Sequence, residues 1–127
     1  NTIKHSALVA KMVQLLDIGT IVVGSSAGAM VLGSWMRKPS NSGLTLGLDI
    51  AKGAIVLPHH ENRDLEETAF WINQTVPTGA TVLGIDAKSG CLMTSRGWKV
   101  IGDGNVTVYL AGDRTVYGPG SFISYIT

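Results

Sequence analysis

The sequence predicts a three-layer α/β sandwich that has a mainly parallel central sheet and C-terminal antiparallel hairpins. Apolar residues recur every three to five positions in three segments, which is typical of helices that bury one face. Short apolar runs without polar alternation lie between these segments and indicate strands buried on both faces. Near the C-terminus, apolar and polar residues alternate around turn dipeptides, as they do in hairpins.

The predicted elements follow one another in the order helix, strand, helix, strand, helix, strand, before the hairpins begin. The helix patterns cover residues 3–16, 26–36 and 62–76, with Asn62 as the expected N-cap of the third. The strand patterns cover residues 20–23, 54–57 and 81–85. The hairpins are centred on Arg96–Gly97 and Gly112–Asp113. A chain of 127 residues fits one domain, which we expect to span residues 1–127.

The composition is that of an ordinary soluble domain and excludes several classes of protein. The net charge of +1 lacks the basic excess of nucleic-acid-binding proteins, and no apolar run approaches the roughly 18 residues of a membrane-spanning helix. The single cysteine, Cys91, forms neither an internal disulfide nor a CxxC zinc motif. We therefore expect a cytoplasmic protein that binds no metal, nucleic acid or membrane, and in which Cys91 serves packing.

The stretch from Gly24 to Gly28, GSSAG, fits the pattern G-x-S-x-G between a predicted strand and a predicted helix. In this pattern the serine lies at the tip of a tight turn, where side chains two residues before and after it would collide. Gly24 and Gly28 are therefore expected to be glycines because the turn leaves no room for a side chain at either position. The turn would expose the Ser26 hydroxyl as a nucleophile, and the backbone N–H of Ala27 would stabilise an oxyanion.

Two other interpretations of the same glycines remain open at this point. A turn of small residues can serve close packing alone, and a glycine-rich turn before a helix can hold a phosphate. The phosphate interpretation is weaker because no Lys-Ser or Lys-Thr pair follows the glycines. The preceding strand, the following helix and a histidine at the end of the next strand favour the nucleophile.

A general base for Ser26 is expected where a neighbouring parallel strand ends, at the same edge of the sheet. His59 and His60 follow the predicted strand 54–57 and its final Pro58. Adjacent residues that leave a strand point in opposite directions, so only one of the two faces Ser26. We assign His59 as the base and keep His60 as its rival. His5, on the first helix, is expected at the surface.

Three stretches of the sequence carry a resemblance to a known family: VVGSSAGAMVLG, GLDIAKGAIVLPHHENR and VLGIDAKSGCLMTSRGWKVIGDGNVTVY. They resemble the serine peptidases of the peptidase E and cyanophycinase group, which form peptidase family S51. The resemblance implies the class I glutamine amidotransferase-like, flavodoxin-like fold, with Ser26 as the nucleophile and His59 as the base. It also implies hydrolysis of amide bonds in aspartate-containing peptides, without a cofactor. Arg63 matches an arginine that recurs shortly after the family's histidine.

The acidic member of the family's catalytic triad has no clear counterpart in this chain. The family places an acidic residue between the serine and the histidine, where it orients the imidazole. Between residues 27 and 58 this chain offers only Asp49. Asp49 is therefore the candidate third catalytic residue, and a loop amide such as Asn41 is the alternative.

The expected substrate-binding residues surround the same site. They are Ser25, His60 and Arg63, and His60 stands where family members carry an aromatic residue. Arg37 with Lys38 is a second source of positive charge for a substrate carboxylate.

Members of the family carry a further βαβ region before the first helix, and it ends in a Gly-rich stretch that supplies a second oxyanion donor. This chain begins at Asn1 without it, so we expect an N-terminal segment or a second chain, as in a homodimer, to complete the domain. Without that region, Val22 and Ile55 would lack covering strands.

The alternative function is a catalytically inactive amidotransferase-like binding module. An α/β-hydrolase esterase is disfavoured, because no histidine follows Thr81.

Overall fold

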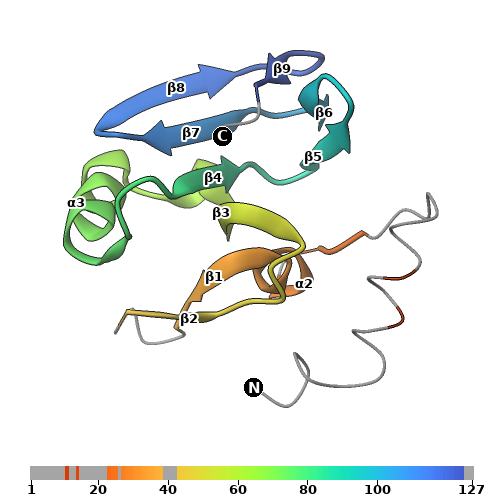
Figure 1. Cartoon of the computed structure of the whole chain (residues 1–127). Helices are drawn as coiled ribbons and strands as arrows, with labels where there is room; N and C mark the ends of the chain where they lie inside the picture. The colour runs from red at the N-terminus through yellow and green to blue at the C-terminus, as the bar shows by residue number, and fades with distance from the viewer. Residues whose placement is uncertain (1–10, 12–13, 15–22, 26, 39–42, 125–127) are drawn as a thin grey trace.

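The computed structural model describes residues 11, 14, 23–25, 27–38 and 43–124. Its centre is a mixed sheet in the order β2-β1-β3-β4-β7-β8 (Figure 1). The strands are β1 (Gly33–Arg37), β2 (Leu44–Leu46), β3 (Ala51–Pro58), β4 (Thr81–Ile85), β7 (Val106–Leu110) and β8 (Asp113–Tyr117). The central strands β1, β3 and β4 are parallel, and antiparallel strands flank them on both sides.

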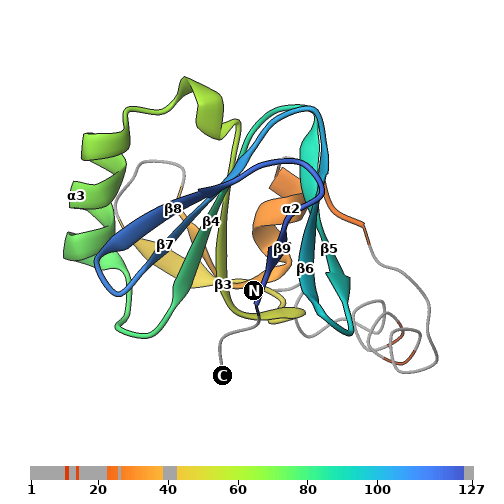
Figure 2. The same ribbon diagram turned by 90° about the horizontal axis from the view of Figure 1, so that it is seen from above.

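Both faces of this sheet are covered, which gives three layers (Figure 2). The helix α3 (Leu65–Thr75) covers one face. The other face carries the short helix α2 (Ala27–Val31) and a second sheet of β5 (Ser89–Thr94), β6 (Gly97–Gly102) and β9 (Phe122–Ile123). The central sheet therefore has two apolar cores, one against α3 and one against the second sheet. The predicted α/β class is confirmed.

Several predicted elements are confirmed because local patterns determine them. The apolar run 54–57 lies within β3, whose residues 54–57 are buried, and the predicted strand 81–85 is β4. The two predicted hairpins are β5–β6 and β7–β8. The third predicted helix is α3, but its N-cap is Asp64, whose carboxylate accepts hydrogen bonds from the N–H groups of Glu66 and Glu67. Asn62 instead lies in a preceding 3₁₀ turn, η1 (His60–Asn62).

The prediction of a helix over residues 26–36 is wrong beyond Val31. α2 ends at Val31, and the chain continues from Gly33 as β1, which pairs in parallel with β3. A side chain at Gly33 would overlap the carbonyl oxygen of Ala54, so the glycine permits this close approach. Pairing with a buried strand thus overrides the local helix pattern. The same pairing shows that Ile55, contrary to the expectation, does not lack a covering strand: it pairs with Trp35 on β1 and is fully buried.

The predicted helix 3–16 and the predicted strand 20–23 lie mostly outside the described residues. Within strand 20–23, only Val23 is described; it belongs to no strand and is 84% exposed. Among the helices of the described residues, none has the length and apolar character needed to cross a membrane.

Candidate functional site

Gly24 and Gly28, which flank the predicted nucleophile Ser26 in the sequence, lie close together. The Gly28 N–H donates a hydrogen bond of 2.8 Å to the Ser25 carbonyl oxygen, and α2 starts at Ala27. A Cβ at Gly24 would overlap the Gly28 carbonyl oxygen and lie 2.9 Å from the Ala29 nitrogen. At Gly28, by contrast, a Cβ would meet nothing within 4 Å. The steric requirement expected of both glycines therefore falls on Gly24 alone.

Ser26 itself lies outside the described residues, as does the side chain of Ala27. Ser25 is exposed beside the turn. α2 packs against β1 and β3. Its carboxyl end adjoins the start of β3, because the Ala51 N–H donates to the Leu32 carbonyl oxygen at 2.7 Å. The turn at residues 24–28 is at the opposite, amino end of this five-residue helix.

His59 directly follows β3 at its carboxyl end and is exposed. Its backbone has φ 54° and ψ 43°, the left-handed conformation, which is uncommon for residues other than glycine. The chain then enters η1, where the Asn62 N–H donates to the His59 carbonyl oxygen at 3.2 Å. The position after a parallel strand agrees with the sequence prediction.

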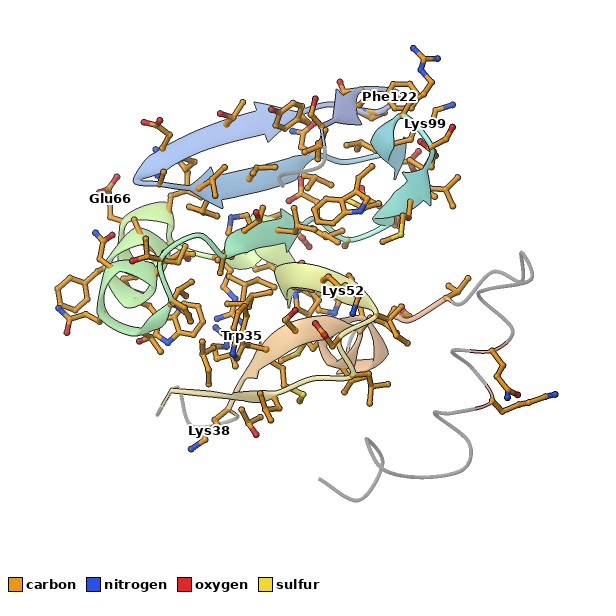
Figure 3. The ribbon with its side chains drawn as sticks, in the orientation of Figure 1. Trp35, Lys38, Lys52, Glu66, Lys99 and Phe122 are labelled. Carbon is orange, nitrogen blue, oxygen red and sulfur yellow. The ribbon has the colours of Figure 1, made fainter. Side chains whose placement is uncertain are left out.

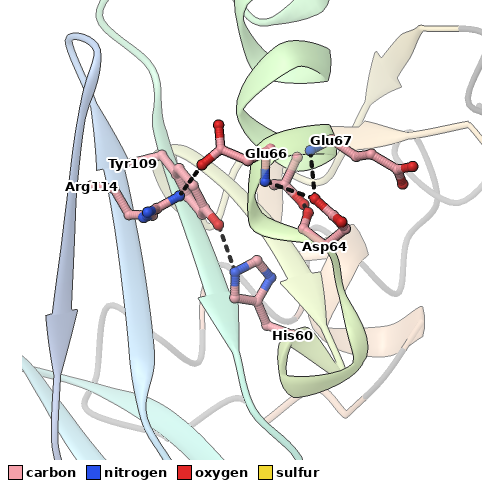
Figure 4. Close-up of polar contacts among 7 residues, drawn as sticks. His60, Asp64, Glu66, Glu67, Tyr109 and Arg114 are labelled. Carbon is pink, nitrogen blue, oxygen red and sulfur yellow. Dashed lines mark hydrogen bonds and ion pairs between the residues drawn. The ribbon is translucent and has the colours of Figure 1, made fainter.

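His60 points to the interior, opposite to His59. It is 3% exposed, and its Nε2 lies 2.7 Å from the Tyr109 hydroxyl (Figure 4). The two rings meet edge to face with centroids 5.5 Å apart. A Cβ at Gly84 would lie 2.5 Å from two ring carbons of His60, so the ring rests on the β4 backbone. A ring packed in this way is poorly placed for the rival-base and substrate-binding roles.

Asp49 and His59 flank opposite ends of β3. The strand has eight residues, so it separates them by on the order of 20 Å. The Asp49 carboxylate accepts a hydrogen bond from the Ser34 hydroxyl and pairs with Lys52 at 3.2 Å. Figure 3 shows Lys52 on the side of the molecule away from α3. The structure therefore does not bring Asp49 to the imidazole. Asn41, the alternative, lies outside the described residues.

Arg63 and Arg37 line a small cavity of about 70 Å³ between β1, β3 and α3. Arg37 lies over the Trp71 ring, 5.9 Å from its centroid. Burial, and then the neighbouring charge of Arg63, lowers the pKa of Arg37. Asp64 and Glu67 also line the cavity, and the Asp64 carboxylate caps α3. The structure thus brings together two of the three predicted basic residues; Lys38 is exposed and does not line the cavity.

Sequence reasoning missed three residues around the histidines: Tyr109, Gly84 and Glu61. The Glu61 carboxylate accepts a hydrogen bond of 2.8 Å from the Ala87 N–H, and this bond lowers the Glu61 pKa. Tyr109 lies 49 residues beyond its histidine partner. No local pattern signals a contact over such a separation.

Among the described residues, no group of three His, Cys, Asp or Glu side chains could hold a metal ion. Burial raises the pKa of the Cys91 thiol to about 11, and the side chain packs against the core between the two sheets. A thiol of this kind is a poor nucleophile, in agreement with the packing role predicted for Cys91.

We expect the protein to lose stability on acidification below about pH 6.5, because burial lowers the pKa of His60 from its ordinary value of 6.5. Asp86 and Glu61 oppose this shift, and Arg63 and Arg114 add to it. The unfolded chain binds the proton first as the pH falls, so the contribution of His60 is complete above pH 6.5 and declines below it. Urea unfolding at pH 7.5 and 5.5 measures this change. His60→Gln should remove part of it, and an unchanged pH dependence would contradict the prediction.

No family model matches the sequence, and no curated protein matches it. Among solved structures, the chain is similar to a peptidase from an acI-B1 Actinobacterium, with 26% sequence identity and a TM-score of 0.64. The match covers 79% of this chain and 43% of the peptidase chain, so this chain spans less than half of that length. The likeness supports a peptidase-like α/β fold.

Proposed function

We propose that this chain forms part of a serine peptidase of the peptidase E and cyanophycinase kind, family S51, with Ser26 as the nucleophile and His59 as the base. One observation carries the proposal: the Gly24 backbone lies against Gly28, with room for no side chain at residue 24. Such a turn around a central serine is the arrangement that presents a nucleophile. The similarity to a solved peptidase supports the peptidase part of this proposal.

The proposed reaction is acyl transfer to water. His59 removes the Ser26 proton as the hydroxyl oxygen attacks an amide carbonyl, and the Ala27 N–H donates a hydrogen bond to the oxyanion. The protonated imidazole then gives its proton to the leaving amine. Water hydrolyses the acyl-enzyme, and His59 acts again as the base. α2 has only five residues, so the backbone N–H contributes more to oxyanion stabilisation than the dipole of the helix does.

The proposed substrates are aspartate-containing peptides. Arg63 and Arg37 present two guanidinium groups at one small cavity, and such groups bind carboxylates through paired hydrogen bonds. Trp71 lines the same cavity, and its buried Nε1 has no hydrogen-bond partner among the described residues. Asp64 and Glu67 line the same cavity, so a substrate carboxylate would lie beside the two guanidinium groups and away from these two acidic side chains. Ser25, exposed beside the turn, would contact the peptide backbone.

A catalytically inactive binding module is the second candidate, and the position of Asp49 favours it. The predicted orienting carboxylate lies at the far end of β3 from His59. Removal of the orienting acid from a Ser-His-Asp triad lowers kcat by about 10⁴-fold. A module without that acid could keep the turn for packing and bind a ligand without hydrolysing it.

A fluorophosphonate probe distinguishes the two candidates, because it forms an adduct only with an activated serine. In the whole protein that carries this chain, we expect one adduct, located on Ser26 by mass spectrometry. Ser25→Ala should retain labelling as the matched control for the neighbouring hydroxyl. Ser26→Ala and His59→Gln should abolish it.

The absence of an adduct from the folded, unmodified protein would reject the peptidase and favour the binding module. Circular dichroism of each variant verifies that the comparison concerns folded protein. An adduct on Ser25 rather than Ser26 would also contradict the assignment of the nucleophile.

A further inference from the structure

The backbone at His59 adopts the left-handed conformation, which is uncommon for residues other than glycine. A residue other than glycine in the left-handed region costs about 1 kcal/mol or more. His59 adopts it at the point where β3 ends and the chain turns into η1. The surrounding structure must therefore hold the turn.

The next residue supplies the first attachment. His60 is buried, and its Nε2 shares a hydrogen bond of 2.7 Å with the hydroxyl of Tyr109 on β7 (Figure 4). Its ring lies against Gly84 on β4, where any side chain would collide with it. His60 therefore connects the end of β3 to the next two strands of the sheet, β4 and β7. Its Nδ1 has no hydrogen-bond partner among the described residues, so the bond to Tyr109 is the polar contact seen for this ring.

A second attachment lies one residue further along the chain. The Glu61 carboxylate accepts a hydrogen bond from the Ala87 N–H, which is just beyond β4. The Arg63 N–H closes the turn by donating to the His60 carbonyl oxygen at 3.0 Å. His59 is thus followed by two residues that are fixed to other parts of the fold, one inside the core and one at its surface.

We infer that the His60–Tyr109 hydrogen bond and the packing of His60 on Gly84 hold His59 in its left-handed conformation, so that His60 and Tyr109 are positioning residues for the proposed base. The inference rests on the proposed function of His59 and adds residues that touch neither the substrate nor the reacting atoms. Its physical basis is the opposite orientation of two adjacent side chains: one ring is locked inside, and the other is thereby presented outside.

Tyr109→Phe in the whole protein tests this inference, because it removes one hydroxyl and keeps the ring. We expect kcat to fall about 10- to 100-fold with KM within about twofold, since misplacement of a base affects the chemical step. Hydrogen exchange at the amides of Asn62 and Arg63 should be about tenfold faster. His60→Gln retains an N–H near the Nε2 position and should preserve most of kcat, whereas His60→Leu should lose it.

Val100→Ala is the control for stability, because Val100 is buried in the other core, between the two sheets. It should lower the unfolding midpoint and leave kcat and the exchange of those two amides unchanged. If Tyr109→Phe leaves kcat unchanged in a protein whose Ser26 accepts the probe, this inference is overturned and the proposed function is not. Failure of the unmodified protein to hydrolyse peptides or accept the probe would reject the proposed function, and the inference with it.

Discussion

Ser26→Ala and His59→Gln are each expected to lower kcat/KM for an aspartyl peptide by about 10³-fold or more. The two residues act as one unit in the proposed reaction, because an unactivated hydroxyl is a weak nucleophile and a base without its hydroxyl has no proton to accept. The double variant should therefore lose little more than either single variant. Hydrolysis followed by release of the new amino group measures all three.

His5→Gln is the control for this series, since it makes the same replacement at a histidine for which no catalytic role is predicted. It should leave kcat/KM within about twofold of the unmodified protein. Losses at Ser26 and His59 that multiply in the double variant would show that the two residues act independently, contrary to the proposed pair.

Gly24→Ala should destabilise the protein by about 3 kcal/mol and remove probe labelling, whereas Gly28→Ala should do neither. The methyl group at residue 24 would meet the Gly28 carbonyl and the Ala29 nitrogen, which are backbone atoms that cannot rotate away. At residue 28 the methyl group meets nothing within 4 Å. Because Gly28 lies inside α2, its replacement by alanine should raise the free energy of unfolding by at most about 1 kcal/mol.

Urea unfolding of the two variants at pH 7.5, together with probe labelling, measures this contrast. The pair is closely matched, since both replacements add one methyl group within four residues of each other in the same motif. Equal effects at Gly24 and Gly28 would contradict the tight turn at the centre of the proposed site.

The sequence predicts best those elements whose determinants are local. The apolar run before Pro58, the strand 81–85 and the apolar stripe of α3 each contain the information that specifies them. The positions of the two hairpins are also predictable from the sequence, because glycine at residues 97 and 112 supplies the positive φ of the turns. These elements determine the α/β class and the carboxyl end of β3, where His59 lies.

The failures concern interactions between distant residues. Residues 26–36 carry a helical pattern, yet β1 begins at Gly33 because β3 offers a buried partner. Asp49 is the one carboxylate between the turn and Pro58, but chain order does not reveal that an eight-residue strand separates it from His59. The pairing of His60 with Tyr109 is equally invisible, because it depends on how the C-terminal hairpin joins the sheet.

The contact between His60 and Tyr109 also has a consequence for the order of folding. Hairpins such as β7–β8 close over a few residues and form quickly, whereas the parallel pairing of β3 with β4 must wait for α3 to cross the sheet. Tyr109 follows His60 by 49 residues, so a chain still emerging from the ribosome holds the histidine turn without its anchor. The turn at His59, the proposed base, therefore lacks this hydrogen bond until β7 has been synthesised.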